Sequence, residues 1–131
     1  MIVLDSWALL ALLRAEPAAP AVREAIEESG LAVISWVNLG EVAYIAARRV
    51  GWGRAEEVVR DAARSLVRAE DPDPNLVMHA AKWKADGGLS YADAFAAATA
   101  ERHRAPLLTG DPELIALNGR IDVVDLRDAS T

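Results

Sequence analysis

Short apolar runs alternate along the chain with longer segments in which apolar residues recur at helical spacing. The runs at residues 2–4, 31–34, 106–108 and 121–126 are rich in Ile, Leu and Val, and we interpret them as strands. A further short strand is expected within residues 66–69. Continuous apolar runs of this kind, without alternating polar residues, are typical of strands buried on both faces of a parallel sheet.

The longer segments predict helices over residues 6–15, 20–29, 36–50, 54–66, 75–85, 90–104 and 112–117. Pro17, Gly30, Gly51 and the turn-rich segment 70–74 separate several of these helices. Strands that alternate with helices predict an α/β protein, here a three-layer α/β/α fold with a small central, mostly parallel sheet. The length predicts a single domain over residues 1–131.

Composition narrows the function classes. The chain has no cysteine, which excludes disulfides and thiolate metal sites. The net charge of −6 argues against nucleic-acid binding through overall charge, although carboxylates that hold divalent cations can still present positive charge to a phosphate. The apolar run at residues 7–13 is far shorter than the roughly 20 residues that span a bilayer. We therefore expect a cytoplasmic protein without a membrane anchor.

Three acidic residues occupy positions where an acid often caps a helix. Asp5 follows the first strand, Asp93 lies three residues after Ser90 in a capping-box pattern, and Asp111 precedes a proline. Glu41 differs, because it lies in the middle of a largely apolar helix. A solvated polar stripe and a stripe that lines a cleft both remain open for this helix.

Taken together, the acids suggest a metal site. The carboxyl ends of parallel strands share one edge of a sheet, so Asp5 and Asp111 should lie at the same edge, with Asp93 in a helix that starts there. Carboxylates in one place repel one another and coexist best around a hard cation such as Mg²⁺ or Mn²⁺. Such a site can activate water and stabilise charge at a phosphodiester.

Several motifs in this order resemble those of the PIN domain family, and specifically the VapC ribonuclease toxins of bacterial toxin–antitoxin pairs. The resemblance rests on IVLDS at residues 2–6, on IS at 34–35 leading to NLGEV at 38–42, on LSYADA at 89–94, on ATA at 98–100 and on LLTGD at 107–111. It covers essentially the whole chain and implies a PIN-like fold.

The resemblance also implies an active site. The acidic quartet of the family corresponds to Asp5, Glu41, Asp93 and Asp111, which would hold one or two Mg²⁺ or Mn²⁺ ions and catalyse RNA hydrolysis. Ser6 and Thr109 match small hydroxyl positions that support the site. Glu113 could assist or replace Asp111, or it could simply be an acid in the first turn of a helix.

Other polar residues are weaker candidates. Asn38, Glu41 and Arg48 share one face of their helix, so we include Asn38 as a supporting residue and Arg48 as a possible RNA contact, together with Arg14. His79 and His103 have no partner at metal-ligand spacing and are expected to be structural or surface residues.

Tryptophans could stack on bases, but their contexts favour other roles. Trp7 and Trp36 lie in apolar helices, which favours the core or a dimer interface. Trp52 lies in a Gly51-Trp52-Gly53 turn and is expected to be exposed.

The resemblance implies a homodimer and a cognate antitoxin whose peptide occupies the acidic groove, with the apolar early helices as the contact surfaces.

Two alternatives to this function remain. One is a catalytically silent PIN-like module that binds RNA or a partner. The other is a metal-dependent phosphohydrolase with an aspartyl nucleophile, which usually requires a second acid two residues after the first, where this chain has Trp7.

Overall fold

A parallel sheet of five short strands forms the centre of the computed structural model, which describes residues 1–127. The strands are β1 (Ile2–Leu4), β2 (Ala32–Ser35), β3 (Arg68–Glu70), β4 (Leu107–Thr109) and β5 (Val123–Asp125). Their spatial order is β3-β2-β1-β4-β5, and every neighbouring pair is parallel. The first strand of the chain therefore lies at the centre of the sheet, and the prediction of a mostly parallel sheet is confirmed.

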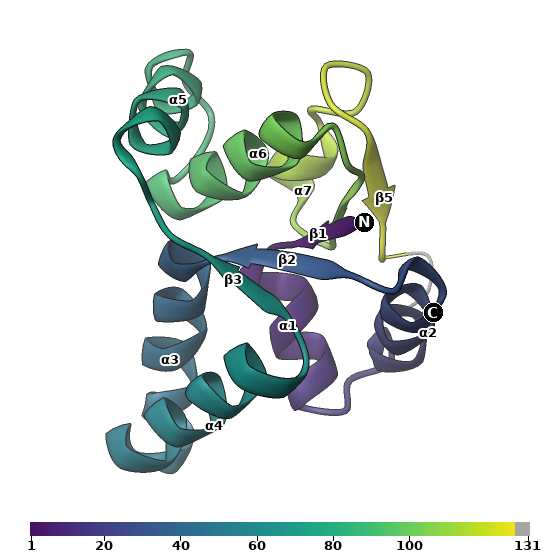
Figure 1. Ribbon diagram of the computed structural model, residues 1–131, viewed down its shortest axis with the longest axis vertical. Helices are drawn as coiled ribbons and strands as arrows, with labels where there is room; N and C mark the ends of the chain where they lie inside the picture. The colour runs from purple at the N-terminus through teal and green to yellow at the C-terminus, as the bar shows by residue number, and fades with distance from the viewer. Residues whose placement is uncertain (128–131) are drawn as a thin grey trace.

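Helices cover both faces of the sheet (Figure 1). One face packs against α1 (Ser6–Leu13), α2 (Ala19–Ser29), α3 (Trp36–Val50) and α4 (Trp52–Ser65). The other packs against α5 (Pro74–Ala85), α6 (Tyr91–His103) and α7 (Pro112–Ile115). This is the expected three-layer α/β/α arrangement. Within residues 1–127, no helix is both long enough and apolar enough to cross a membrane.

The core is divided between these two faces by the alternation of side chains along each strand. In β1, Ile2 and Leu4 contribute to the cluster beneath α1 to α4, whereas Val3 contributes to the cluster beneath α5 to α7. Ile34 and Val33 divide in the same way in β2. Both faces of the central strands are thus buried, which explains why their sequences are apolar without alternation.

Most element boundaries differ from the predicted ones by one to two residues, and one difference has a clear cause. Gly51 has a φ of 83° and is both the C-cap of α3 and the N-cap of α4. A single glycine therefore makes the turn, and Trp52 and Gly53 belong to the first turn of α4 rather than to a loop. The expectation of a three-residue turn was wrong, whereas Trp52 is exposed as predicted.

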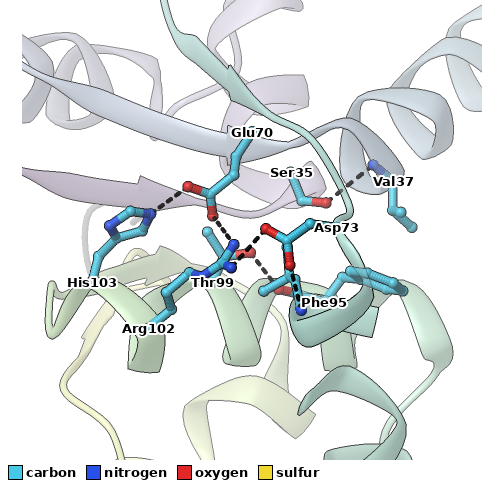
Figure 2. A network of polar contacts seen from close by, with 9 residues as sticks. Ser35, Val37, Glu70, Asp73, Phe95, Thr99, Arg102 and His103 are labelled. Atoms are coloured by element: carbon cyan, nitrogen blue, oxygen red, sulfur yellow. Dashed lines mark hydrogen bonds and ion pairs between the residues drawn. The ribbon is translucent and has the colours of Figure 1, made fainter. Parts of the chain in front are cut away.

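A polar network fastens the edge strand β3 to α6 (Figure 2). Glu70, at the end of β3, pairs with His103 at 2.6 Å and with Arg102 at 3.7 Å. Arg102 also pairs with Asp73 at 2.6 Å, and Asp73 caps α5 by accepting a hydrogen bond from the Leu76 amide at 2.9 Å. These contacts fix the ends of α5 and β3 against α6, whose other end contributes Asp93 to the site described next.

Candidate active site

A hollow of about 340 Å³ opens at the carboxyl edge of the sheet. Its lining comes from the β1–α1 junction, from α3, from the start of α6 and from the β4–α7 loop: Asp5, Ser6, Trp7, Glu41, Ile45, Ser90, Asp93 and Asp111. All four predicted acids are therefore brought to one place by four segments that are distant in sequence. Their catalytic and metal-binding roles remain predictions.

Asp5 is the most deeply buried of the four acids, with an exposed fraction of 1%. Its Oδ1 accepts a hydrogen bond from the Ala8 amide at 2.9 Å, so it is also the N-cap of α1, and its Oδ2 accepts one from the Thr109 hydroxyl. Burial raises the pKa of Asp5 from 3.8 to about 7, and the charges of Asp93 and Asp111 add to this effect, while the two hydrogen bonds oppose it.

Asp93 lies in the first turn of α6 and is 8% exposed. Ser90 caps the helix by accepting a hydrogen bond from the Asp93 amide at 3.1 Å, which leaves the Asp93 carboxylate directed to the site. Burial, followed by the charge of Asp111 and more weakly that of Glu41, raises the pKa of Asp93 to about 7. The two interpretations of this segment, a helix start and a candidate ligand, are therefore compatible.

Asp111 lies next to a fifth acid, Glu113. Its Oδ1 accepts a hydrogen bond from the Glu113 amide at 2.8 Å, while its own amide donates to Thr109 Oγ1 at 2.9 Å. Carboxylate oxygens of Asp93, Asp111 and Glu113 lie within 4.8 Å of one another, close enough to share one cation. The sequence left the role of Glu113 open, and its position next to Asp93 makes it a candidate ligand.

Asn38 supports the site from the interior. It is fully buried on α3, and its Nδ2 donates to the Ala92 carbonyl at 3.0 Å and to Ser6 Oγ at 3.4 Å. The Ser6 hydroxyl in turn donates to the Asn38 carbonyl at 3.1 Å. This one side chain therefore ties α3 to the helix starts that contain Asp5 and Asp93.

The polar stripe predicted on α3 divides between three environments. Asn38 is internal, Glu41 is half-buried at the hollow, and Arg48 is exposed. The Tyr44 hydroxyl donates to Glu41 Oε2 at 3.4 Å, and the Arg48 guanidinium lies 5.6 Å from the centre of the Tyr44 ring. Arg14 lies elsewhere, on a separate hollow of about 500 Å³ between α1, α3 and α4.

Trp7, like Ile45 and Ser90, lines the hollow although sequence reasoning did not assign it to the site. The sequence favoured the core or a dimer interface, and the half-buried indole does pack on the core. It also lines the acidic hollow and presses on Gly110, where an added Cβ would overlap the ring. Its position two residues after Asp5, and the glycine between Thr109 and Asp111, are the sequence signals of this contact.

The donor set fits a hard divalent cation. All the candidate ligands are carboxylates, which is the ligand type that Mg²⁺ and Mn²⁺ favour. Burial, and to a smaller extent the charges of neighbouring acids, raise the pKa values of Asp5 and Asp93, and none of the described residues that line the hollow is basic and could offer compensation. A bound cation would supply that compensation and hold both groups ionised at neutral pH.

The fold and the site together define an α/β protein with a parallel sheet and an acidic hollow at the carboxyl edge of that sheet. The sequence profile of the PIN domain matches residues 2–119. The chain therefore belongs to the PIN domain family, as the sequence motifs predicted. Among curated protein sequences, no significant match to the chain was found.

Solved structures share this fold across nearly the whole chain. VapC20 of Mycobacterium tuberculosis, a toxin that cleaves the sarcin–ricin loop, has a TM-score of 0.72 at 23% identity, covering 90% of this chain and 95% of its own. DNA-bound VapBC of Salmonella typhimurium has a TM-score of 0.73 at 20% identity, covering 96% and 99%. FitAcB of Neisseria gonorrhoeae has a TM-score of 0.67 at 18% identity, covering 97% and 99%.

Proposed function

We propose that this protein is a Mg²⁺- or Mn²⁺-dependent endoribonuclease that acts as the toxin of a type II toxin–antitoxin pair. The observation that supports this most strongly is the gathering of Asp5, Glu41, Asp93 and Asp111 around one hollow in a PIN domain. The names of the solved relatives, which include a sarcin–ricin-loop-cleaving toxin and a toxin–antitoxin complex, support the choice of RNA as substrate and of an antitoxin as partner.

In this mechanism the four acids, with Glu113 beside Asp93 and Asp111, would hold the cation. When bound, Mg²⁺ or Mn²⁺ would activate water and offset charge at the phosphodiester. Thr109 fixes the Asp5 carboxylate, and its Oγ1 also holds the amide of Asp111. The protein's own contribution is thus to keep several carboxylates close together and in fixed orientation despite their repulsion.

We propose that the antitoxin and a second copy of the chain bind the apolar early helices. The hollow between α1, α3 and α4 combines apolar side chains such as Leu10, Leu13 and Val58 with Arg14 and Arg49. An antitoxin segment with apolar residues and flanking acids would complement this lining. An antitoxin arginine that reaches the acidic hollow would pair with the carboxylates and compete with the cation.

The two alternatives are less well supported. A phosphohydrolase with an aspartyl nucleophile usually requires a second acid two residues after the first, and in this chain that position is Trp7, which packs on Gly110. A silent binding module would have no need to keep four acids together at the energetic cost that their repulsion and burial impose.

The direct test is cleavage of a mixed cellular RNA pool by the purified protein with Mg²⁺, with Mn²⁺ and with EDTA. We expect cleavage that depends on the metal and is abolished in Asp93→Asn. Glu28→Gln, at an exposed position on α2, is the matched control and should cleave like the wild type. Metal binding without cleavage of any RNA in the pool, by protein shown to be free of antitoxin, would favour the silent module.

A further inference from the structure

Resting on the proposed function, we propose that bases of single-stranded RNA stack on Trp7 and Tyr44 at the acidic hollow. We call these two residues the aromatic pair. The proposal assigns two substrate-contacting residues in addition to the acids, and stacking on them requires bases that are unpaired.

Trp7 is part of the lining of the hollow itself. The indole is only half-buried, and its contact with Gly110 fixes it between the loop that precedes Asp111 and the helix start that follows Asp5. Ile45, one turn after Glu41 on α3, adds a second apolar side chain to the lining. The hollow thus offers carboxylates for a cation that binds phosphate and, beside them, apolar surface that the phosphate chemistry does not use.

Tyr44 provides the second face. It is 49% exposed, and its hydroxyl donates to Glu41 Oε2, so one end of the ring is held against the acids. Desolvation, and then the charge of Glu41, raises the pKa of Tyr44, and Asp93 also contributes. The Arg48 guanidinium lies over one face of the ring, 5.6 Å from its centre, so a base would stack on the opposite face with this positive charge close by.

The charge of the chain favours a contribution from stacking. The chain has a net charge of −6, and none of the described residues that line the hollow is basic. A protein without a basic groove gains little of the phosphate-neutralising affinity on which most nucleic-acid binders depend. Stacking of a base on an aromatic ring contributes affinity without charge and requires only an exposed π face, which unpaired bases have.

The other tryptophans do not meet these conditions. Trp83 is 6% exposed, beneath the guanidinium of Arg120 at 4.5 Å. Trp52 is 58% exposed but lines a different hollow, between α3 and α4, together with Trp36. Trp52 is therefore the matched control for Trp7.

The first experiment needs no cleavage. A ¹H–¹⁵N spectrum is recorded in the presence of Mg²⁺, which is diamagnetic, unlike Mn²⁺. Single Trp→Phe variants assign the indole N–H signals. They are then followed during titration with the four nucleoside 5′-monophosphates and with ribose 5-phosphate. We expect the Trp7 signal to shift with the nucleotides but not with ribose 5-phosphate, and the Trp52 signal to stay in place. A Trp7 signal whose chemical shift does not change with any of the four nucleotides would overturn the proposal.

The second experiment measures cleavage of a short single-stranded RNA by Trp7→Leu, Tyr44→Leu, their Phe counterparts and Trp52→Leu. Each Leu variant of the aromatic pair should raise KM about tenfold with little change in kcat, the scale expected for one stacked base. Phe should restore most of the loss at both positions, whereas Trp52→Leu should match the wild type. Thermal melting confirms that each variant is folded.

Two outcomes separate stacking from a structural role. If Trp7→Leu weakens Mn²⁺ binding as much as it raises KM, Trp7 only positions Asp111 through Gly110, and the proposal fails. If Tyr44→Phe is as impaired as Tyr44→Leu, the hydroxyl rather than the ring matters, and the proposal fails at that position. If nucleotides shift the Trp7 signal but the protein cuts no RNA, the stacking site is supported and the nuclease proposal fails. If the protein cuts RNA and KM is unchanged in both Leu variants, the nuclease proposal is supported and the stacking site fails.

Discussion

The hydroxyl group of Thr109 donates a hydrogen bond to the carboxylate of Asp5, although 104 positions separate the two residues in the chain. The same oxygen accepts the amide of Asp111, so one threonine at the end of β4 fixes two of the four acids. It can do so because β1 and β4 are adjacent parallel strands whose carboxyl ends lie side by side. The threonine is fully buried, and so neither bond competes with bulk water.

Thr109→Val removes this hydroxyl at nearly constant volume. The hydrogen bond lowers the pKa of Asp5, so its loss should raise that pKa further and move the acidic limb of the pH–rate profile to higher pH. The unpaired Asp111 amide should also cost roughly 1–3 kcal/mol of stability. Thr109→Ser should restore both properties. Profiles of the Val variant and the wild type that superimpose would show that the bond does not influence catalysis.

The pKa of Asp5 predicts how the stability of the metal-free protein changes with pH. The folded-state pKa of about 7 exceeds the ordinary 3.8, so between these values the folded state binds more protons than the unfolded state. The contribution of Asp5 to stability is therefore fully present below about pH 4 and is lost as pH rises through 7.

Asp5→Asn removes this titration while keeping a good N-cap residue. Urea denaturation in EDTA from pH 4 to pH 8 gives the free energy of unfolding of both proteins. Relative to the wild type, that of the Asn variant should increase as pH rises, by up to roughly 4 kcal/mol at 1.36 kcal/mol per pKa unit. A difference between the two proteins that stays constant over this range would mean that Asp5 is ionised with an ordinary pKa.

Glu41→Gln tests whether the acid on α3 is a metal ligand. Gln retains an oxygen that can accept from Tyr44 but lacks the charge that a hard cation requires. Saturating Mg²⁺ or Mn²⁺ should therefore raise the Tm of this variant less than that of the wild type. The control Glu28→Gln should show the full shift. If Glu41→Gln showed the full shift as well, Glu41 would not be a ligand.

Glu113→Gln tests the acid whose role the sequence left open. Because its carboxylate lies within 4.8 Å of those of Asp93 and Asp111, we expect a loss of about tenfold in Mn²⁺ affinity, measured by calorimetry. Its amide, which Asp111 Oδ1 holds, is unchanged by the substitution. Wild-type affinity in Glu113→Gln, together with weakened binding in Asp111→Asn, would assign Glu113 to the first turn of α7 only.

Local chemistry made much of the fold predictable. Buried parallel strands are continuous apolar runs, and Asp5, Ser35 and Ser90 are residues that cap helices by their own side chains, so strand ends and helix starts could be read directly. The parallel order of elements then predicted that the acids would meet at one edge. Boundaries were less accurate where one residue serves two elements, as Gly51 does.

Other features depend on contacts that no local pattern contains. The Nδ2 group of the buried Asn38 bonds Ala92 and Ser6, which lie 54 and 32 positions away, while its Oδ1 has no hydrogen-bond partner among the described residues. Trp7 meets Gly110 only after β1 and β4 have paired. Helical spacing alone could place Asn38 on a face of α3, but it could not show whether that face is inside or outside.

The position of β1 at the centre of the sheet also determines when its strand pairings can form during synthesis of the chain. β1 is made first but pairs with β2 and β4, so its second partner is complete only at Thr109, and the last acid of the quartet follows at Asp111. Pairings so distant in sequence form late, because the entropy cost of loop closure is incurred before the stabilising contacts have formed. On the ribosome, the acidic hollow would therefore stay incomplete until nearly all of the domain had emerged.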